Sequence, residues 1–227
     1  PHNTALWVKD FKGNHPKFVF YKLETLNLQT FNGGVSVPTL NRNVLDDLEV
    51  SIPNHEAQKQ IAEILSAYDD LIENNRRRMA LLEDAARQLY REWFVRLRFP
   101  GHEHTPITNG VPEGWERVPT PEAVDINPRT ALSDEEEHWY VEMSNLHLDS
   151  MVINGAVRRG GRSGSKFHNG DTLLARITPC LENGKTGFVN FMADGETGRG
   201  STEFIVLRSK RVTPEFVYCL ARTYDFR

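Results

Sequence analysis

The most restrictive feature of this sequence is the segment between Pro53 and Pro100, which contains neither proline nor glycine. It is rich in Ala, Leu, Glu, Arg and Gln, all of which favour helix. We therefore predict one uninterrupted helix over residues 54–98. About 45 helical residues would extend roughly 65 Å, far more than the three or so turns of an average globular helix. Because a single helix of this length needs a partner to lie against, the segment is typical of a coiled coil.

Apolar residues recur along this helix in alternating steps of four and three, which is the period of a left-handed supercoil. No second segment of the sequence resembles it, so the partner helix belongs to another chain, including a second copy, or to another part of a longer protein. One polar residue, Asn75, interrupts the apolar line; it either aligns the partner helix or marks a solvated gap. The predicted helix-pairing seam is Ile61, Leu65, Tyr68, Ile72, Asn75, Met79, Leu82, Ala86, Leu89 and Trp93.

The flanks of the helix have the features of mixed structure. Short apolar or aromatic runs at residues 17–21, 172–177 and 203–207 are bounded by Gly, Asn or Pro and predict strands. Residues 99–114 hold three Pro and three Gly, which predicts a linker. We expect an α/β (α+β) fold in which mixed domain material flanks one long coiled-coil helix.

An internal repeat links the two ends of the chain. When the sequence is shifted by 198 positions, residues 4–19 align with residues 202–217 without gaps, and six pairs are identical. The end of the chain thus repeats its start, which predicts that the chain covers close to one period of a longer protein with two similar halves. The identical pairs are Thr4 with Thr202, Val8 with Val206, Lys12 with Lys210, Pro16 with Pro214, Phe18 with Phe216, and Val19 with Val217.

Composition excludes several classes of protein. The 227 residues are 39% apolar, which is enough for an ordinary core and argues against disorder or a disulfide scaffold. The formal net charge of −4 gives no global attraction to nucleic acid, so any DNA contact requires a local basic patch. The two cysteines, Cys180 and Cys219, suit a reducing compartment, and no run is apolar and long enough for a bilayer span. We expect a cytoplasmic protein without membrane contact.

Several stretches resemble the conserved central region of the specificity subunits of type I restriction-modification systems. They run in the same order and spacing as in that family, and the similarity continues into residues typical of the start of a target-recognition domain. The stretches are 35–42 (VSVPTLNR), 50–53 (VSIP), 56–65 (EAQKQIAEIL), 68–75 (YDDLIENN), 81–83 (LLE), 89–94 (LYREWF), 98–103 (RFPGHE), 112–115 (PEGW) and 170–185 (GDTLLARITPCLENGK).

The resemblance implies four parts: residues 1–53 as the C-terminal part of one target-recognition domain, 54–98 as the conserved spacer helix, 99–114 as a linker, and 115–227 as the N-terminal part of the next recognition domain. It implies double-stranded DNA as ligand, and methyltransferase (modification) and restriction subunits as partners. This chain would itself be non-catalytic and bind no cofactor, with S-adenosylmethionine and ATP/Mg on the partner subunits. The protein would be a fragment or a half-length form of such a subunit.

A local basic segment supplies candidates for DNA contact. Residues 157–187 carry a charge of +4 within an acidic chain, and residues 158–166 are rich in Gly and Ser, which allow close approach to phosphate. A solvated basic loop, and for Asn183-Gly184 an ordinary turn, are the alternatives. The Asn32–Ser36 stretch is more typical of a structural turn than of a phosphate contact. The candidate DNA-binding residues are Arg158, Arg159, Arg162, Lys166, Arg176, Asn183 and Lys185.

Enzymatic and metal sites find little support in the sequence. There is no G-x-G-x-x-G motif, and Asn127-Pro128 is followed by Arg129 rather than by the Pro-aromatic pair of an adenine methyltransferase. His102 and His104 lack further metal ligands nearby. Off-seam apolar residues such as Leu71 and Phe94 either contact a modification subunit or pack on the recognition domains.

Two functions therefore stand side by side. In the first, the chain is a sequence-specific DNA-recognition subunit that directs the methyltransferase and restriction subunits to a bipartite target. In the second, it is a coiled-coil assembly module whose recognition domain is incomplete and does not read DNA.

Overall fold

The computed structural model describes residues 7–28, 48–133 and 137–227. The chain divides into two compact units, Pro1–Arg77 and Arg78–Arg227, so the division falls inside the long helix and each unit contains a section of it. The Asn32–Ser36 stretch lies outside the described residues. In the described ranges, no helix combines the length and the apolar character needed to cross a bilayer.

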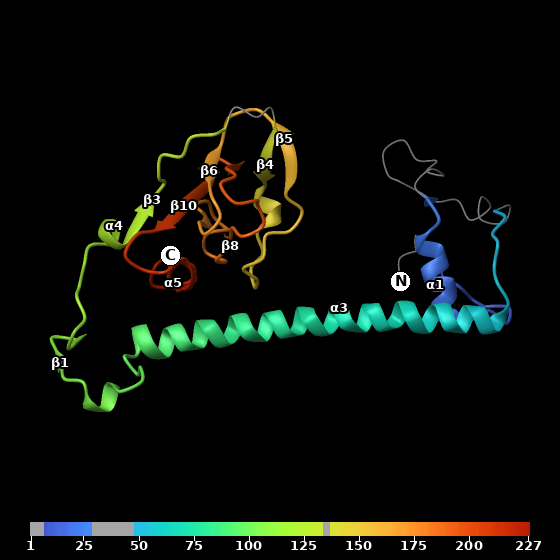
Figure 1. Ribbon diagram of the computed structural model, residues 1–227, viewed down its shortest axis with the longest axis horizontal. Helices are drawn as coiled ribbons and strands as arrows, with labels where there is room; N and C mark the ends of the chain where they lie inside the picture. The colour runs from blue at the N-terminus through green and yellow to red at the C-terminus, as the bar shows by residue number, and fades with distance from the viewer. Residues whose placement is uncertain (1–6, 29–47, 134–136) are drawn as a thin grey trace. The chain divides into compact units, whose positions relative to one another are not determined.

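The predicted long helix is present as α3, which spans His55–Tyr90 over 36 residues and is the longest element in Figure 1. It begins where predicted, because the side chain of Asn54 accepts a hydrogen bond from the Ala57 amide at 2.9 Å and caps the first turn. It continues only as a π-helical turn, η2, over Arg91–Val95. Leu97 then takes a positive φ of 56°, which ends the helix before the expected residue 98.

In the N-terminal unit, the strand expected at residues 17–21 is wrong: the segment lies in helix α1, Pro16–Glu24. Proline stands at the helix start, where its fixed φ is favourable and its missing N–H costs nothing. The buried Phe18 and the hydroxyl of Tyr21, which donates to Asp69 at 2.6 Å, lie on the side of α1 that faces α3. Phe18 and Tyr21 are three residues apart, so they lie on one face of a helix. Their tertiary contacts outweigh the strand propensity of the aromatic run.

The buried Gln58 joins the start of α1 to α3. Its Oε1 accepts a hydrogen bond from the His15 amide at 2.9 Å, and its Nε2 donates to Asn14 Oδ1 at 2.8 Å. Gln58 is 3% exposed, so both ends of its amide are satisfied away from water.

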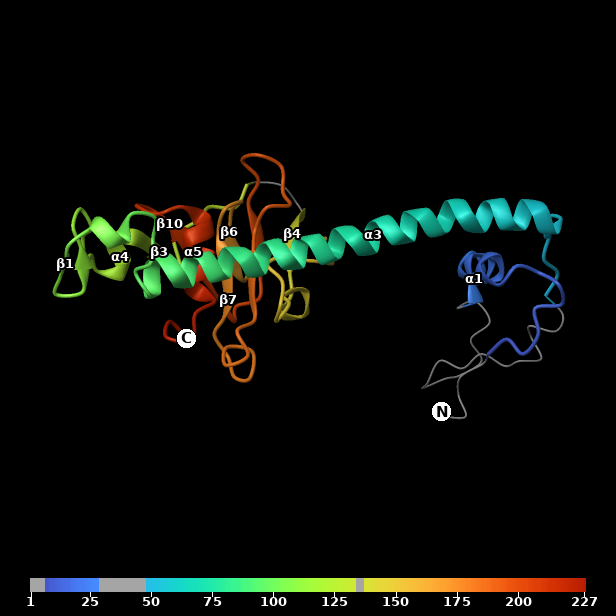
Figure 2. The same ribbon diagram turned by 90° about the horizontal axis from the view of Figure 1, so that it is seen from below.

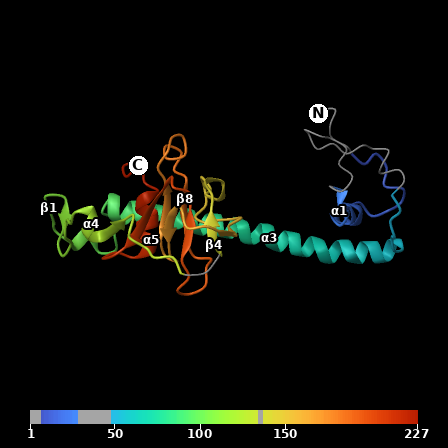
Figure 3. The ribbon, with the colours of Figure 1, turned by 90° about the horizontal axis from the view of Figure 1, so that it is seen from above.

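The C-terminal unit contains two four-stranded sheets, seen from two sides in Figure 2 and Figure 3. One is antiparallel throughout, in the order β3-β10-β7-β8. The other has the order β5-β4-β9-β6 and contains one parallel pair, β4 with β9. The strands are β3 Val124–Ile126, β4 Glu137–Val141, β5 Val157–Gly160, β6 Ser165–Phe167, β7 Thr172–Ala175, β8 Thr186–Phe188, β9 Gly198–Gly200 and β10 Phe204–Ser209.

The strands predicted at residues 172–177 and 203–207 are confirmed as β7 and β10, and the mixed fold class is confirmed with them. Their apolar side chains enter a core shared by the two sheets, which includes Phe167, Leu173 and Val206. Two glycines in β9 leave no room for a side chain within their sheet: a Cβ at Gly198 would lie 2.3 Å from the Phe167 ring of β6, and one at Gly200 would lie 2.6 Å from the Val141 carbonyl oxygen of β4.

Short elements connect these parts. The predicted linker contains a 3₁₀ turn, η3 His102–His104, and a two-stranded hairpin of β1, Ile107–Thr108, with β2, Val111–Pro112. Further along the chain are helix α4, Thr120–Ala123, and the 3₁₀ turn η4, Met143–Asn145.

Helix α5, Pro214–Ala221, docks the sheets on the C-terminal section of α3. On one side, Val217 packs with Val124 and Leu207 of the antiparallel sheet. On the other, the Phe216 ring makes edge contacts with Tyr90 and Phe94. Of the two alternatives given for Phe94, packing within the chain is therefore the one that the structure supports.

A buried carboxylate completes this junction. Glu83 of α3, 8% exposed, accepts hydrogen bonds from the Tyr218 hydroxyl at 2.6 Å and from the Met151 amide at 2.8 Å. Arg87 Nη1 lies 3.7 Å from Glu83 Oε1 and adds an ion pair within the helix. Burial, and then the hydrogen bond to Glu83, raise the pKa of the Tyr218 phenol above its ordinary value.

The internal repeat is matched by the two short helices. Helices α1 and α5 both begin with proline at aligned positions, Pro16 and Pro214, and each packs on a section of α3 in its own unit. Upstream the two copies differ, since Val206 lies in β10 whereas Val8 is in no strand. The two-halves prediction itself stays a prediction.

We expect Tyr218→Phe to lower the free energy of unfolding at neutral pH by about 2 kcal/mol, because a hydrogen bond to a charged, buried acceptor is lost. Urea titration measures this value. Tyr224→Phe is the matched control, since Tyr224 is 85% exposed, and it should leave the midpoint unchanged.

Tyr218→Phe should also change how the free energy of unfolding depends on pH. The folded protein keeps the Tyr218 phenol protonated above its ordinary pKa of 10.0, whereas the unfolded chain releases that proton, so wild-type stability falls as pH rises beyond about 10. Tyr218→Phe should show a shallower decline than Tyr224→Phe in that range. Equal alkaline slopes would contradict the assignment of a buried phenol.

Candidate nucleic-acid interface

The predicted DNA-binding residues belong to several strands and turns of the C-terminal unit rather than to one loop. Arg158 and Arg159 lie on β5, which pairs with β4, so the interpretation of residues 158–166 as a continuous loop is wrong. Only residues 161–164 form a turn, and Lys166 follows it on β6. Arg176 stands just after β7, and Asn183 and Lys185 close the turn before β8.

Arg158 is held by the protein itself. Its guanidinium forms an ion pair with Glu196 and lies 5.2 Å from the centre of the Trp139 ring. The hydrogen bond from the Ala193 amide and, to a smaller extent, the Arg158 guanidinium lower the pKa of the Glu196 carboxyl. Arg158 therefore has a defined position on the outer face of β5.

Arg159 is held less firmly than Arg158. Its Nη1 lies 3.5 Å from Glu142 Oε1, and its guanidinium stacks 5.0 Å from the centre of the Tyr140 ring. Both partners of this ion pair are more than half exposed, so the pair is weak and can be exchanged for a phosphate.

A buried arginine that the sequence analysis did not single out supports the turn. Arg199 of β9 is 3% exposed and donates hydrogen bonds to the carbonyl oxygens of Arg159, at 2.9 Å, of Ser163, at 3.3 Å, and of Gly160. Its guanidinium also lies 4.7 Å from the centre of the Tyr140 ring. Because this buried cation is stabilised by carbonyl dipoles, it fixes the backbone that carries Arg159 and Arg162.

The turn itself depends on glycine. Gly164 has φ +104°, and a Cβ there would lie 2.0 Å from the Gly200 carbonyl oxygen. Arg162, two residues earlier, is exposed and makes no hydrogen bond or ion pair with the part of the chain that the structure describes. It is thus presented to solvent from a turn whose backbone is well supported.

The remaining candidates divide into two groups. Asn183 and Lys185 lie in the turn before β8. The Ala175 amide donates to the Lys185 carbonyl oxygen at 3.0 Å, and Gly184 has a φ of +71°. This geometry is that of an ordinary turn, which was the alternative interpretation of the Asn-Gly pair. Lys166 and Arg176 instead meet at a polar cleft of about 400 Å³. The cleft is also lined by Asn127, Arg129, Thr130, Gly164, Ser165, Thr202, Phe204 and Val206.

Arg129 is a cleft residue that the sequence did not predict, because it stands far from the other candidate cations along the chain. The Asn127-Pro128 pair before it is its only local sequence signal, and that pair gives no indication of DNA contact. In the described residues no cluster of three or more His, Cys, Asp or Glu could hold a metal ion.

The predicted helix-pairing residues that lie on α3 are exposed in both of its sections, whereas Trp93 lies in η2 and is only partly exposed. Exposure ranges from 37% for Leu65 to 70% for Leu82. The contacts of α3 in each unit use other residues, such as Ala62 in the first and Glu83 in the second. The apolar seam is therefore open to a partner helix.

Comparison with known proteins finds a similarity in the N-terminal part of the chain. Residues 2–84 match the family described as the type I restriction modification DNA specificity domain, which confirms the resemblance found in the sequence. The specificity subunit of the type I restriction enzyme MjaIX of Methanocaldococcus jannaschii is 32% identical over 105 residues, which are 44% of this chain and 24% of that protein. The EcoEI specificity subunit of Escherichia coli is 34% identical over 106 residues, 43% of this chain and 17% of that protein. The chain thus spans about a quarter or less of these relatives.

Two solved structures are also similar. The HsdS subunit from Thermoanaerobacter tengcongensis aligns with 93% of this chain and 56% of that chain, at 17% identity and a TM-score of 0.38. A chain from a structural study of type I R-M complex assembly and conformational transition aligns with 92% of this chain and 52% of that chain, at 16% identity and a TM-score of 0.39. These scores are too low to assign a shared fold.

We expect Arg199→Met to lower the free energy of unfolding by about 2 to 3 kcal/mol, since three backbone carbonyl groups lose a charged, buried donor. Amides of residues 159–164 should also exchange hydrogen faster than in wild type. Arg176→Met is the control: Arg176 forms only an exposed ion pair, with Glu203, and its loss should change stability by about 0.5 kcal/mol or less. An unchanged urea midpoint for Arg199→Met would contradict the supporting role.

Proposed function

We propose that this chain, whose residues 2–84 belong to the type I restriction-modification DNA specificity family, is all or part of a sequence-specific DNA-recognition subunit. In this role it directs methyltransferase and restriction subunits to a bipartite target. The observation that carries the proposal is the match of residues 2–84 to the specificity domain, supported by curated specificity subunits of 32% and 34% identity.

The described residues favour binding over catalysis. The C-terminal unit presents arginines on β5 and in the adjoining turn, on a backbone supported by Arg199. Such groups position a protein on phosphates and read guanine edges, and neither task requires a catalytic group. We propose that the chain is non-catalytic, and that S-adenosylmethionine and ATP/Mg act on the partner subunits. A DNA-reading subunit works where the DNA is, so the cytoplasmic location expected from the sequence is part of the proposal.

The seam of α3 provides the link to a second recognition domain. Its exposed apolar residues, among them Ile72 and Leu82, have the 3.5-residue period that pairs helices. We propose that a partner helix, from a second copy of this chain or from another part of a longer protein, covers this seam. The pairing sets the spacing between two DNA half-sites.

The first test is selection from randomised duplex DNA by the chain together with modification subunits of its own system. We expect enrichment of two short specified segments separated by an unspecified spacer. A palindromic motif means that two copies pair, and an asymmetric motif means that a different recognition domain completes the site.

The chain alone is assayed in parallel, with its oligomeric state followed by light scattering. Retained DNA without any enriched motif, from a complex that still assembles, would contradict sequence-specific recognition. That result would favour the alternative of a coiled-coil assembly module.

The second test uses two adjacent leucines of equal exposure. Leu82 lies on the seam and Leu81 beside it, and both are 70% exposed. We expect Leu82→Glu to abolish helix pairing, because a charge in an apolar seam is costly, and Leu81→Glu to have no effect. Sedimentation velocity reports the oligomeric state of the full chain, and equal behaviour of the two variants would contradict the seam.

A further inference from the structure

The polar cleft of the C-terminal unit has a fixed wall, formed by the segment that follows β3. Asn127 holds this segment to β10: its amide donates to the Val206 carbonyl oxygen at 2.7 Å, and its side-chain oxygen accepts from the Val206 amide at 2.9 Å. Asn127 has φ +51°, so the chain turns sharply away from the strand after this pair of bonds.

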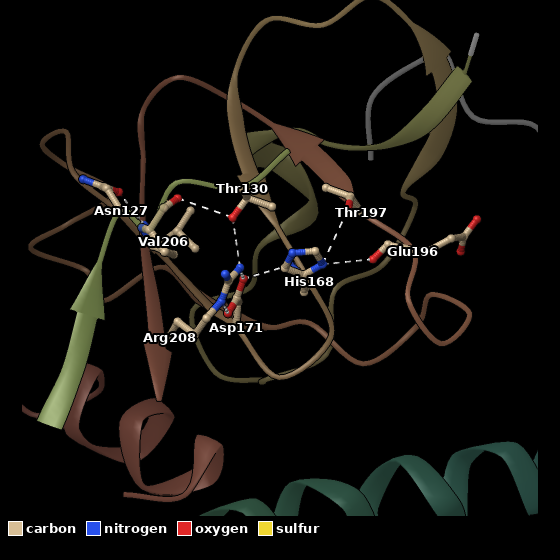
Figure 4. A network of polar contacts seen from close by, with 9 residues as sticks. Asn127, Thr130, His168, Asp171, Glu196, Thr197, Val206 and Arg208 are labelled. Atoms are coloured by element: carbon tan, nitrogen blue, oxygen red, sulfur yellow. Dashed lines mark hydrogen bonds and ion pairs between the residues drawn. The ribbon is translucent and has the colours of Figure 1, made fainter. Parts of the chain in front are cut away.

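A buried ion pair fixes the other end of the same segment (Figure 4). Arg208 of β10 donates to the Thr130 hydroxyl at 3.1 Å and makes two hydrogen bonds, at 2.8 and 2.6 Å, to Asp171. Asp171 is 1% exposed and also accepts from the His168 amide at 2.8 Å. Residues 127 and 130 are therefore both anchored to β10, and the backbone of residues 128 and 129 is held between them.

Arg129 lies between these two anchored residues, and its cationic side chain lines the cleft. It lines the cleft together with Lys166 and Arg176. Neither Arg129 nor Lys166 forms an ion pair or a side-chain hydrogen bond with the residues that the structure describes. Arg176 is paired at the rim with Glu203 at 2.8 Å.

The lining of the cleft contains no carboxylate among the described residues, and it adds the hydroxyl groups of Thr130, Ser165 and Thr202. Another cleft of similar size, lined mainly by residues of α3 and η2, also holds several arginines, but Asp84 and Glu92 line it as well. The three hydroxyl groups already donate within the protein, to the carbonyl oxygens of Pro128 and Phe204 and to the Glu203 carboxylate. The binding capacity of the cleft therefore comes from its cations. Arg129 and Lys166 have no carboxylate partner in the described residues, and such cations beside a fixed backbone favour an anion with several acceptor oxygens.

We infer that this cleft binds a backbone phosphate of the target DNA, with Arg129 as the principal contact and Lys166 as the second. The inference rests on the proposed function, because it assigns to that function a contact that sets the position of the DNA on the protein. A phosphate contact positions the duplex without reading its sequence.

The test is the salt dependence of DNA binding by the full chain with its modification subunits, on the selected duplex and on an unrelated duplex. We expect Arg129→Ala to weaken binding about five-fold at 0.15 M salt and to reduce the slope of log K against log salt by about 1. The loss should be equal on both duplexes. Arg129→Lys should restore most of the slope, since it keeps the charge.

Arg211→Ala is the matched control. Arg211 is exposed like Arg129, but it is paired with Glu116 and lies outside the cleft lining, so its removal should leave the slope unchanged. The urea midpoint of Arg129→Ala should equal that of wild type, which separates a lost contact from a lost fold.

Three results would overturn the inference in different ways. If wild type binds DNA and Arg129→Ala has the same slope, the cleft is not a phosphate site while the proposed function stands. If Arg129→Ala keeps the slope but changes the selected bases, Arg129 reads a base instead. If wild type binds no DNA at any salt concentration, the proposed function fails, and this inference fails with it.

Discussion

The buried carboxylate of Glu83 determines where the C-terminal sheets sit on the section of α3 in their own unit. A charge removed from water is unfavourable unless its hydrogen bonds are replaced, and here Tyr218 and Met151 replace them from two different elements. The ring contacts of Phe216 with Tyr90 and Phe94 add apolar packing, but apolar surfaces tolerate small displacements. The hydrogen bonds to Glu83 do not, so they define the register of the junction.

The same section of helix serves two purposes because its faces are chemically distinct. Glu83 and Tyr90 are buried against the sheets, whereas Leu82 and Leu89, each one residue earlier, remain exposed. Since neighbouring residues on a helix point about 100° apart, docking of the sheets leaves Leu82 and Leu89 exposed. The residues that hold the sheets are therefore different from the exposed leucines of the seam.

Arginine plays three physical roles within one pair of sheets. Arg199 is buried and donates to backbone carbonyls, and Arg158 is paired with Glu196. Arg129 lines a cleft and makes no ion pair with the residues that the structure describes. Only the last arrangement leaves the charge free to exchange water for an anion. The number of arginines in a segment is therefore a poor guide to which of them contact DNA, because burial and pairing decide it.

Local properties of the sequence determined the long helix, its apolar seam and the strands at β7 and β10, because these depend on the period and propensity of consecutive residues. The strand predicted from the aromatic run at residues 17–21 was wrong, because a proline at the helix start and contacts with α3 outweighed strand propensity. The sequence alone also pointed to the specificity family, which residues 2–84 confirm. The tertiary structure alone brought Arg129 beside Lys166, and placed Arg199 beneath the turn, because these residues are distant in sequence and meet only through strand pairing and buried hydrogen bonds.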